Sequence, residues 1–104
     1  IDLGRVLNVT RGDLHWRLTV PDDGHLPTGG LLPAFIEWPD GKNPCHNMPD
    51  LGVRLNQITI STPEPEVISD LMTACGISGF ANIVKGKKGL RFDMTTPYGM
   101  VTLD

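Results

Sequence analysis

His15 and Arg17 lie on one side of a short alternating segment, and their side chains could bind an anionic ligand. Residues 14–20 read Leu-His-Trp-Arg-Leu-Thr-Val, so apolar and polar residues alternate. This period predicts a β-strand with one apolar face and one polar face. An imidazole and a guanidinium on the polar face could line a pocket for an anion. Exposed polar faces are also normal in antiparallel sheets, so a solvated face is the other interpretation.

Other reactive residue types do not form a known catalytic pattern in this sequence. Cys45 and His46 are adjacent in a loop. Neighbouring side chains rarely converge on one metal or substrate, so we expect a structural loop role for both. No Ser-His-Asp or Cys-His-Asn signature is evident. Gly29-Gly30 precedes an expected strand rather than a helix, which is the wrong context for a phosphate-binding loop.

Length and charge limit the classes of partner. The chain has 104 residues, which is one domain or half of a larger one. Its net charge of -3 argues against a nucleic-acid surface. No apolar run approaches the roughly 20 residues that span a bilayer. From the charge and the lack of a long apolar run, we expect neither a nucleic-acid nor a membrane partner. Two cysteines do not make a disulfide framework, so we expect a cytoplasmic protein.

The first part of the chain reads as three strands. Residues 5–10 and 14–20 are predicted to form a β-hairpin. Residues 31–38 are predicted to form an edge or bulged strand, because Pro33 cannot donate a ladder hydrogen bond. Residues 39–52 are rich in Pro and Gly and are interpreted as a linker between two structural units.

The second part opens with a strand that has a polar residue, Gln57, in its middle. The strand pattern over residues 54–60 predicts two faces. Leu55, Gln57 and Thr59 are expected on one face and Asn56, Ile58 and Ile60 on the other.

An amphipathic helix is predicted directly after this strand. Thr62 is the expected N-cap and Pro63 the first helical residue. Gly76 is the expected residue that ends the helix. The apolar stripe contains Val67, Ile68, Leu71, Met72 and Cys75, so Cys75 is expected to be a buried thiol.

Three more strands are predicted after the helix, over residues 80–85, 90–95 and 100–104. The whole chain is therefore predicted to be α+β. Residues 53–104 form a βαβββ module in this prediction, and three strands precede it.

This order of elements resembles one module of the vicinal-oxygen-chelate superfamily, which includes glyoxalase I and the extradiol dioxygenases. The resemblance is closer still to the bacterial glyoxalase-like domain proteins. The resemblance rests on segments 16–21, 29–38, 55–60 and 96–103, together with Pro63. It implies that residues 1–38 are the last three strands of a truncated first module, joined by the linker 39–52 to the complete module 53–104.

The resemblance also implies a site. Metal-dependent members hold a divalent ion with residues from the first and last strands of each module. Glu37 and Gln57 fall on two such positions, and Zn, Ni, Fe or Mn would suit such ligands. Gln57 could instead orient a ligand, and Glu37 could pair with Arg17 across the sheet. The ligand-binding residues expected from pattern and resemblance together are His15, Arg17, Glu37 and Gln57.

Two functions follow from the resemblance. One is a metal-dependent lyase, isomerase or dioxygenase that acts on a small molecule in a cavity between modules. The other is a non-catalytic small-molecule-binding or sequestering domain on the same scaffold, with no metal. Because the apolar face of residues 14–38 would lack its covering helix, we also expect a missing N-terminal segment or a second subunit, as in a dimer, to cover it.

Overall fold

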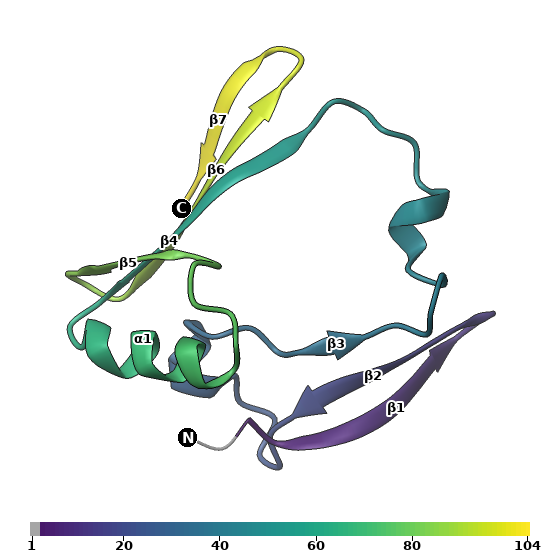
Figure 1. Ribbon diagram of the computed structural model, residues 1–104, viewed down its shortest axis with the longest axis horizontal. Coiled ribbons are helices and arrows are strands. Elements are labelled where there is room, and N and C mark those ends of the chain that lie inside the picture. The colour runs from purple at the N-terminus through teal and green to yellow at the C-terminus, as the bar shows by residue number, and fades with distance from the viewer. Residues whose placement is uncertain (1–2) are drawn as a thin grey trace. The chain divides into compact units, whose positions relative to one another are not determined.

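The computed structural model describes residues 3–104, and the chain divides into two compact units. Unit 1 is Ile1–Pro49 and unit 2 is Asp50–Asp104. Each unit has its own sheet, as the colour gradient of Figure 1 makes easy to follow. The boundary falls inside the expected linker 39–52, where a short 3-10 helix spans Pro44–Asn47. That residues 1–38 belong to a truncated module stays a prediction.

Unit 1 contains a three-stranded antiparallel sheet in the order β1-β2-β3. The strands are β1 (Arg5–Arg11), β2 (Leu14–Val20) and β3 (Ile36–Glu37). The predicted hairpin is confirmed, with Asn8 opposite Arg17 in its register.

The third strand is much shorter than the predicted 31–38. A 3-10 helix occupies Pro27–Gly30, and only Ile36 and Glu37 join the sheet. Leu31 and Leu32 are buried, which shows that this apolar run serves packing rather than a ladder. Pro33 has no N–H to give to a neighbouring strand, so extended pairing begins only after it.

The apolar face of the unit 1 sheet is partly exposed. Its register places Val9, Trp16, Leu18 and Ile36 on the side opposite Arg17. The rings of Trp16 and Trp38 pack with centroids 5.0 Å apart and planes inclined at 42°. Ile36 is 49% exposed. The cover predicted for this face stays a prediction.

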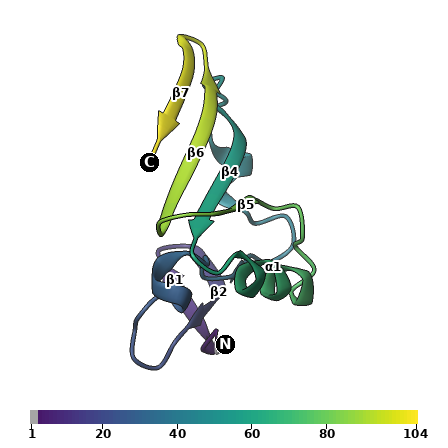
Figure 2. The same cartoon turned by 90° about the vertical axis from the view of Figure 1, so that its left-hand side faces the viewer.

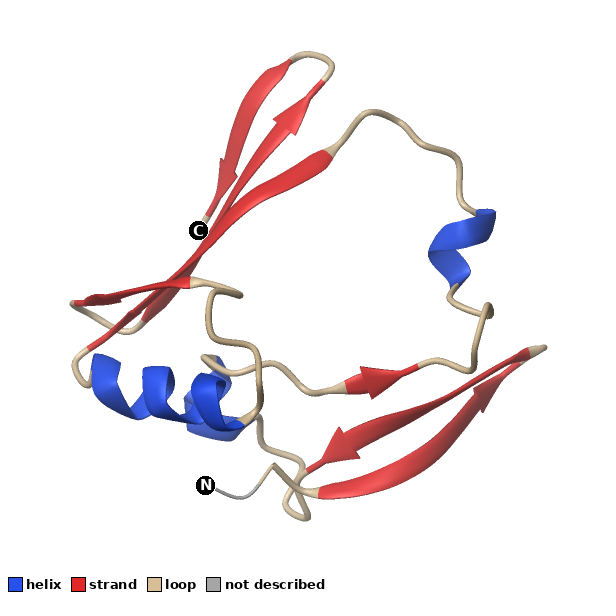
Figure 3. Cartoon of the chain, viewed as in Figure 1, coloured by secondary structure: helices blue, strands red, loops and turns tan. Residues whose placement is uncertain are grey.

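Unit 2 is the predicted βαβββ module, and this part of the fold is confirmed. Its elements are β4 (Arg54–Thr62), α1 (Pro65–Ala74), β5 (Asn82–Lys85), β6 (Gly89–Thr96) and β7 (Gly99–Leu103). The strand order is β5-β4-β6-β7, with β5 parallel to β4 and the other pairs antiparallel. Figure 2 shows β4, β6 and β7 side by side, and Figure 3 separates the strands from the helix by colour.

The core of unit 2 lies where α1 meets the sheet. Ile60 of β4 is 1% exposed, and Ile68 and Met72 of α1 are buried as the apolar stripe predicted. Cys75, expected to be buried, is exposed, because it is the C-cap, where the helical stripe has ended. No described helix is long and apolar enough to cross a membrane.

The helix begins later than predicted. Glu64 is the N-cap and Pro65 the first helical residue, whereas Thr62 still belongs to β4. The Thr62 hydroxyl nevertheless accepts a hydrogen bond from the Glu64 N–H, at 3.2 Å. Pro63 and Pro65 both suit the first turn of a helix, so the sequence pattern is compatible with two starting points for α1. Gly76 follows the C-cap with a φ of +75°, as predicted for a glycine that closes a helix.

A β-bulge in β4 changes the predicted faces of this strand. Gln57 pairs with Asp93, but Leu55 pairs with Met94, so one extra residue lies between these two pairs. Leu55 therefore lies on the apolar side with Met94, and its predicted placement beside Gln57 is wrong. The Asn56 side-chain amide donates to Thr95 Oγ1 at 2.6 Å, which places Asn56 on the polar side as well.

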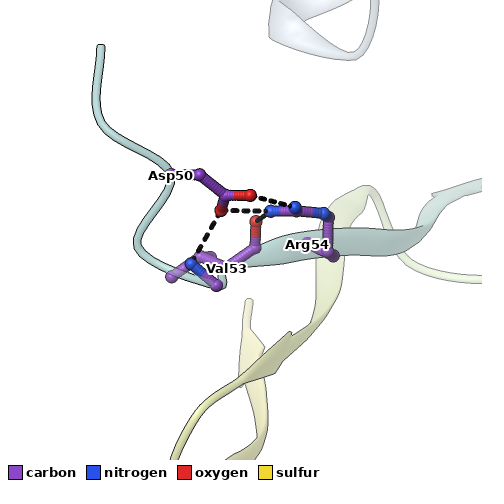
Figure 4. Close-up of polar contacts among 4 residues, drawn as sticks. Asp50, Val53 and Arg54 are labelled. Carbon is purple, nitrogen blue, oxygen red and sulfur yellow. Dashed lines mark hydrogen bonds and ion pairs between the residues drawn. The ribbon is translucent and has the colours of Figure 1, made fainter.

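An ion pair fixes the entry to β4. Arg54 donates from both terminal nitrogens to the Asp50 carboxylate, at 2.9 and 2.6 Å, and the Gly52 N–H also donates to Asp50 at 2.9 Å (Figure 4). These hydrogen bonds and the positive charge of Arg54 hold the pKa of Asp50 well below its usual range. Residues 50–54 thus form a turn, held by these hydrogen bonds, that leads into β4 at the start of unit 2.

Candidate functional site

Three of the four predicted binding residues gather on the polar face of unit 1. Arg17 of β2 pairs with Glu37 of β3 on one side, and with Asn8 of β1 on the other. His15 lies two residues before Arg17 and pairs with Thr10. Because directly paired residues in an antiparallel sheet point to the same face, these five side chains share one surface.

A pocket of about 490 Å³ lies over this region. Its volume is within the range of small-molecule sites. The residues that line it are Asn8, Val9, Thr10, His15, Trp16, Arg17, Glu37 and Pro39. All of them belong to unit 1, so the pocket is formed within one sheet and the segment that follows it.

Arg17 and Glu37 form the central ion pair of the pocket. Arg17 Nε donates to Glu37 Oε1 at 2.7 Å, and Arg17 Nη2 donates to the same oxygen. Both side chains are more than half exposed, at 55% and 65%, so solvent screens their attraction. The pair leaves the second oxygen of Glu37 and three of the five guanidinium N–H donors available. Glu37 thus orients Arg17 without saturating it.

Gln57 belongs to unit 2 and faces a carboxylate there that the sequence pattern did not single out. Its cross-strand partner on β6 is Asp93, and the next residue in the same row is Thr102 of β7. Thr102 Oγ1 donates to Asp93 Oδ1 at 2.7 Å, and Arg91 Nε donates to the same oxygen at 3.2 Å.

Asp93 remains ionised at neutral pH. The hydrogen bond from Thr102, and then the hydrogen bond and charge of Arg91, lower the pKa of the Asp93 carboxyl. Its side chain is only 21% exposed. The alternation of β6 already indicated that Asp93 lies on a polar face; the missing signal was the register that puts it opposite Gln57.

The donor sets within each unit do not fit a complete metal centre. Among residues 3–104, no group of three or more His, Cys, Asp or Glu side chains converges. A cation at Glu37 would also lie beside the guanidinium of Arg17, which repels it. At Cys45 and His46, the Asn43 side chain accepts from the Cys45 N–H and the Met48 N–H donates to the Cys45 carbonyl, and both are turn contacts.

The comparison with protein families agrees with this architecture. The model of the glyoxalase-like domain matches residues 1–76, from the N-terminus through β4 and α1. No curated protein and no solved structure matches the chain. The matched region includes the pocket of unit 1 and Gln57, but not β6 and β7. Because the match extends over more than half of the sequence, the chain belongs to the glyoxalase-like domain family.

Proposed function

We propose that this chain is a small-molecule-binding domain whose ligand carries an anionic group, bound in the pocket of unit 1. The observation that carries the proposal is the Arg17–Glu37 pair inside that pocket. Glu37 holds the guanidinium in place, and the remaining donors of Arg17 can bind a carboxylate or a similar oxyanion. His15, which also lines the pocket, can add a donor.

Electrostatics sets how tightly an anion would bind. The negative charge of Glu37 competes with the ligand for Arg17, and both residues are accessible to solvent. We therefore expect weak binding of simple anions, with the apolar part of a natural ligand supplying further affinity through contact with Pro39, which also lines the pocket. Binding of the anionic group should weaken as ionic strength rises.

A titration with benzoate and its neutral isostere benzamide tests the proposal. Benzoate should bind more tightly than benzamide, and Arg17→Gln should reduce this preference by about tenfold, because a charge-assisted hydrogen bond is lost. Arg11→Gln is the matched control, since Arg11 is exposed on β1 and does not line the pocket. Equal binding of the two probes to the unaltered chain would refute an anion site.

A metal-dependent lyase, isomerase or dioxygenase is the second candidate. It is supported by family membership, by the open oxygen of Glu37 and by Gln57, whose side chain makes no hydrogen bond within residues 3–104. Zn, Ni, Fe or Mn would then be held by Glu37 or by Gln57, in each case together with further ligands. Stoichiometric metal in the purified protein, lost in Glu37→Ala, is the result that this candidate requires.

Glu37→Gln separates the two candidates in one variant. It removes the charge that competes for Arg17 but keeps the side-chain volume. The binding-domain proposal therefore expects benzoate to bind about threefold more tightly. The metal candidate expects metal affinity to fall in the same variant, because a neutral amide is a poorer ligand than a carboxylate.

A further inference from the structure

Two hollows lie one after the other between α1 and β5, which are drawn beside each other in Figures 1 and 2. The first, of about 270 Å³, is lined by Pro65, Glu66, Ser69, Asp70 and Ile83. The second, of about 240 Å³, is lined by Ser69, Met72, Ser78, Gly79, Ala81 and Ile83. Because they share Ser69 and Ile83, the two hollows form one groove, called the α1–β5 groove below. All of its lining residues belong to unit 2.

The strand β5 borders this groove with an unpaired edge. It is the end strand in the order β5-β4-β6-β7, so within residues 3–104 no strand pairs with its outer side. Successive residues of a strand direct their N–H and C=O groups to alternate sides. The Gly86 N–H donates to the Thr62 carbonyl of β4, at 3.0 Å. By this alternation, the backbone groups of Ile83 and Lys85 point outward and can pair with one more strand.

The groove is acidic at the end where α1 begins. Glu66 and Asp70 are exposed, lie one helical turn apart and both line the first hollow. Neither carboxylate forms an ion pair with another residue of the range 3–104. Lys85 ends β5 on this side, opposite Thr62, but lines neither hollow. Two carboxylates beside one lysine leave a net negative charge, which attracts a guanidinium or an ammonium group.

We propose that the α1–β5 groove binds an extended, basic peptide segment of a partner protein, which adds to the four-stranded sheet of unit 2 beside β5. The backbone of the added strand bonds the outward groups of Ile83 and Lys85. Its side chains alternate, so two residues on the face toward α1 lie about 7 Å apart. One of them, an Arg or Lys, enters the first hollow, and the other, a small apolar residue, enters the second, which has no charged lining residue. This interaction surface goes beyond the ligand pocket of unit 1.

Other occupants explain less of the groove. Each hollow is smaller than the roughly 300 Å³ at which small-molecule sites begin, but is large enough for one side chain. A second copy of this chain could add its own β5 in a symmetric antiparallel pair. Lys85 of that copy would then lie beside Asn82, at the second hollow, and the carboxylates of the first hollow would receive no cation.

Nuclear magnetic resonance of the full ¹⁵N-labelled chain tests the groove with two short peptides. They are acetyl-Thr-Arg-Thr-Val-Thr-amide and its reverse, acetyl-Thr-Val-Thr-Arg-Thr-amide, because an added strand can run in either direction. One of them should shift the backbone signals of Ile83 and Lys85 and slow hydrogen exchange of these two amides. Glu in place of the peptide's Arg should weaken binding about tenfold, because Glu66 and Asp70 repel a carboxylate.

The peptide backbone is tested by methylation of its amide nitrogens. Successive amides of an added strand alternate between facing β5 and facing away from it. Of two neighbouring amides, methylation of one should therefore abolish binding and methylation of the other should be tolerated. If methylation of either amide is tolerated, the peptide does not add as a strand and the proposal fails.

Three variants test the side-chain contacts. Glu66→Gln combined with Asp70→Asn should weaken binding of the Arg peptide about tenfold and leave a Gln peptide unaffected. Glu64→Gln is the matched control, because Glu64 is exposed, makes no cap hydrogen bond from its side chain and lines neither hollow. Ser69→Phe fills both hollows from the exposed side of α1 and should abolish binding. Circular dichroism of each variant checks that α1 is intact.

Several results would overturn the proposal. They are an absence of shifts at residues 82–85 with both peptides, equal binding of the Arg and Glu peptides, and unchanged binding in Ser69→Phe. Shifts of the β5 signals that depend on protein concentration without any peptide would assign this edge to a second copy instead. Benzoate binding at Arg17 is measured separately, so failure here leaves the anion pocket intact.

Discussion

Asp93 contributes to stability through the two donors that reach one of its oxygens. The pKa of its carboxyl is lowered in the folded chain by the hydrogen bond from Thr102 and by Arg91, from an ordinary value of 3.8. A lowered pKa means that the folded state favours the ionised form. The stabilising contribution is therefore complete above about pH 5 and is lost as the pH falls through the ordinary value toward the lowered one.

Replacing Asp93 by Asn should remove this pH dependence. We expect Asp93→Asn to lower the free energy of unfolding at about pH 7, and the difference from the unaltered chain to shrink toward about pH 3. Urea unfolding at several pH values, followed by circular dichroism, measures both quantities. Thr102→Val removes the first donor to Asp93. This variant should therefore lose less unfolding free energy between about pH 7 and pH 3 than the unaltered chain does. A difference that stays constant across this range would contradict the assignment.

The sequence identified some of these residues and not others. The alternation of residues 14–20 was sufficient to place His15 and Arg17 on one face, and the pairing of Arg17 with Glu37, kept as an alternative, is present. Asp93 could not be assigned to a site, because its importance depends on the register between β4 and β6. Register is a long-range property that a single strand pattern does not encode.

At the scale of elements, regular strands and the helix were predictable, and their ends were not. Hydrophobic period and the turn glycines located the strands of unit 2 and α1. The bulge in β4 was missed, because it shows only in the register between β4 and β6, two strands that are far apart in sequence. Residues 31–38 were assigned to a strand because they are apolar, yet Leu31 and Leu32 are buried outside any strand.

Gly52 should be essential to the turn that precedes β4. It has a φ of +79°, and a Cβ at this position would lie 2.9 Å from Cγ of Pro97. Gly76 has a similar φ of +75° but open space around it. We expect Gly76→Ala to cost about 1 kcal/mol of unfolding free energy and Gly52→Ala at least about 1 kcal/mol more. If chemical denaturation gives the same loss of unfolding free energy for Gly52→Ala and Gly76→Ala, the close contact of the new Cβ with Pro97 is relieved at no cost.

Ile60 should be the most sensitive position of the unit 2 sheet. It is almost fully buried and packs in the same core as Ile68 and Met72. Ile60→Ala should lower the free energy of unfolding by about 2–5 kcal/mol, because it removes buried methyl groups and leaves a cavity. Val84→Ala, on an exposed position of β5, should cost less than about 1 kcal/mol. Similar losses in the two variants would argue against a core at Ile60.

At the scale of the whole molecule, the order of elements was more informative than any single motif. The arrangement of three strands followed by βαβββ led to the family resemblance, and the family model confirms it over residues 1–76. The expected cover for residues 14–38, by a second subunit or an N-terminal segment, stays a prediction. Leu14 and Ile36 are 39% and 49% exposed, so such a cover would remove apolar surface from water. Light scattering of the purified chain measures whether it dimerises.

The two units should differ in their response to a core mutation. Both tryptophans, Trp16 and Trp38, belong to unit 1, whereas the only α-helix of the described range, α1, belongs to unit 2. Tryptophan fluorescence therefore reports unit 1, and circular dichroism of the helix reports unit 2. Within residues 3–104 no strand is shared between the two sheets, so we expect each unit to keep its own backbone ladder when the other unfolds.

Ile60→Ala should then lower the thermal midpoint of the helix signal and leave the tryptophan midpoint nearly unchanged. The physical reason is that the deleted methyl groups are buried side-chain atoms of unit 2. Trp38→Phe is the reciprocal variant: it disrupts the ring contact with Trp16 and should lower the tryptophan midpoint only. If both midpoints fall together in both variants, the units unfold as one cooperative body, and the division at residue 49 does not correspond to a unit of folding.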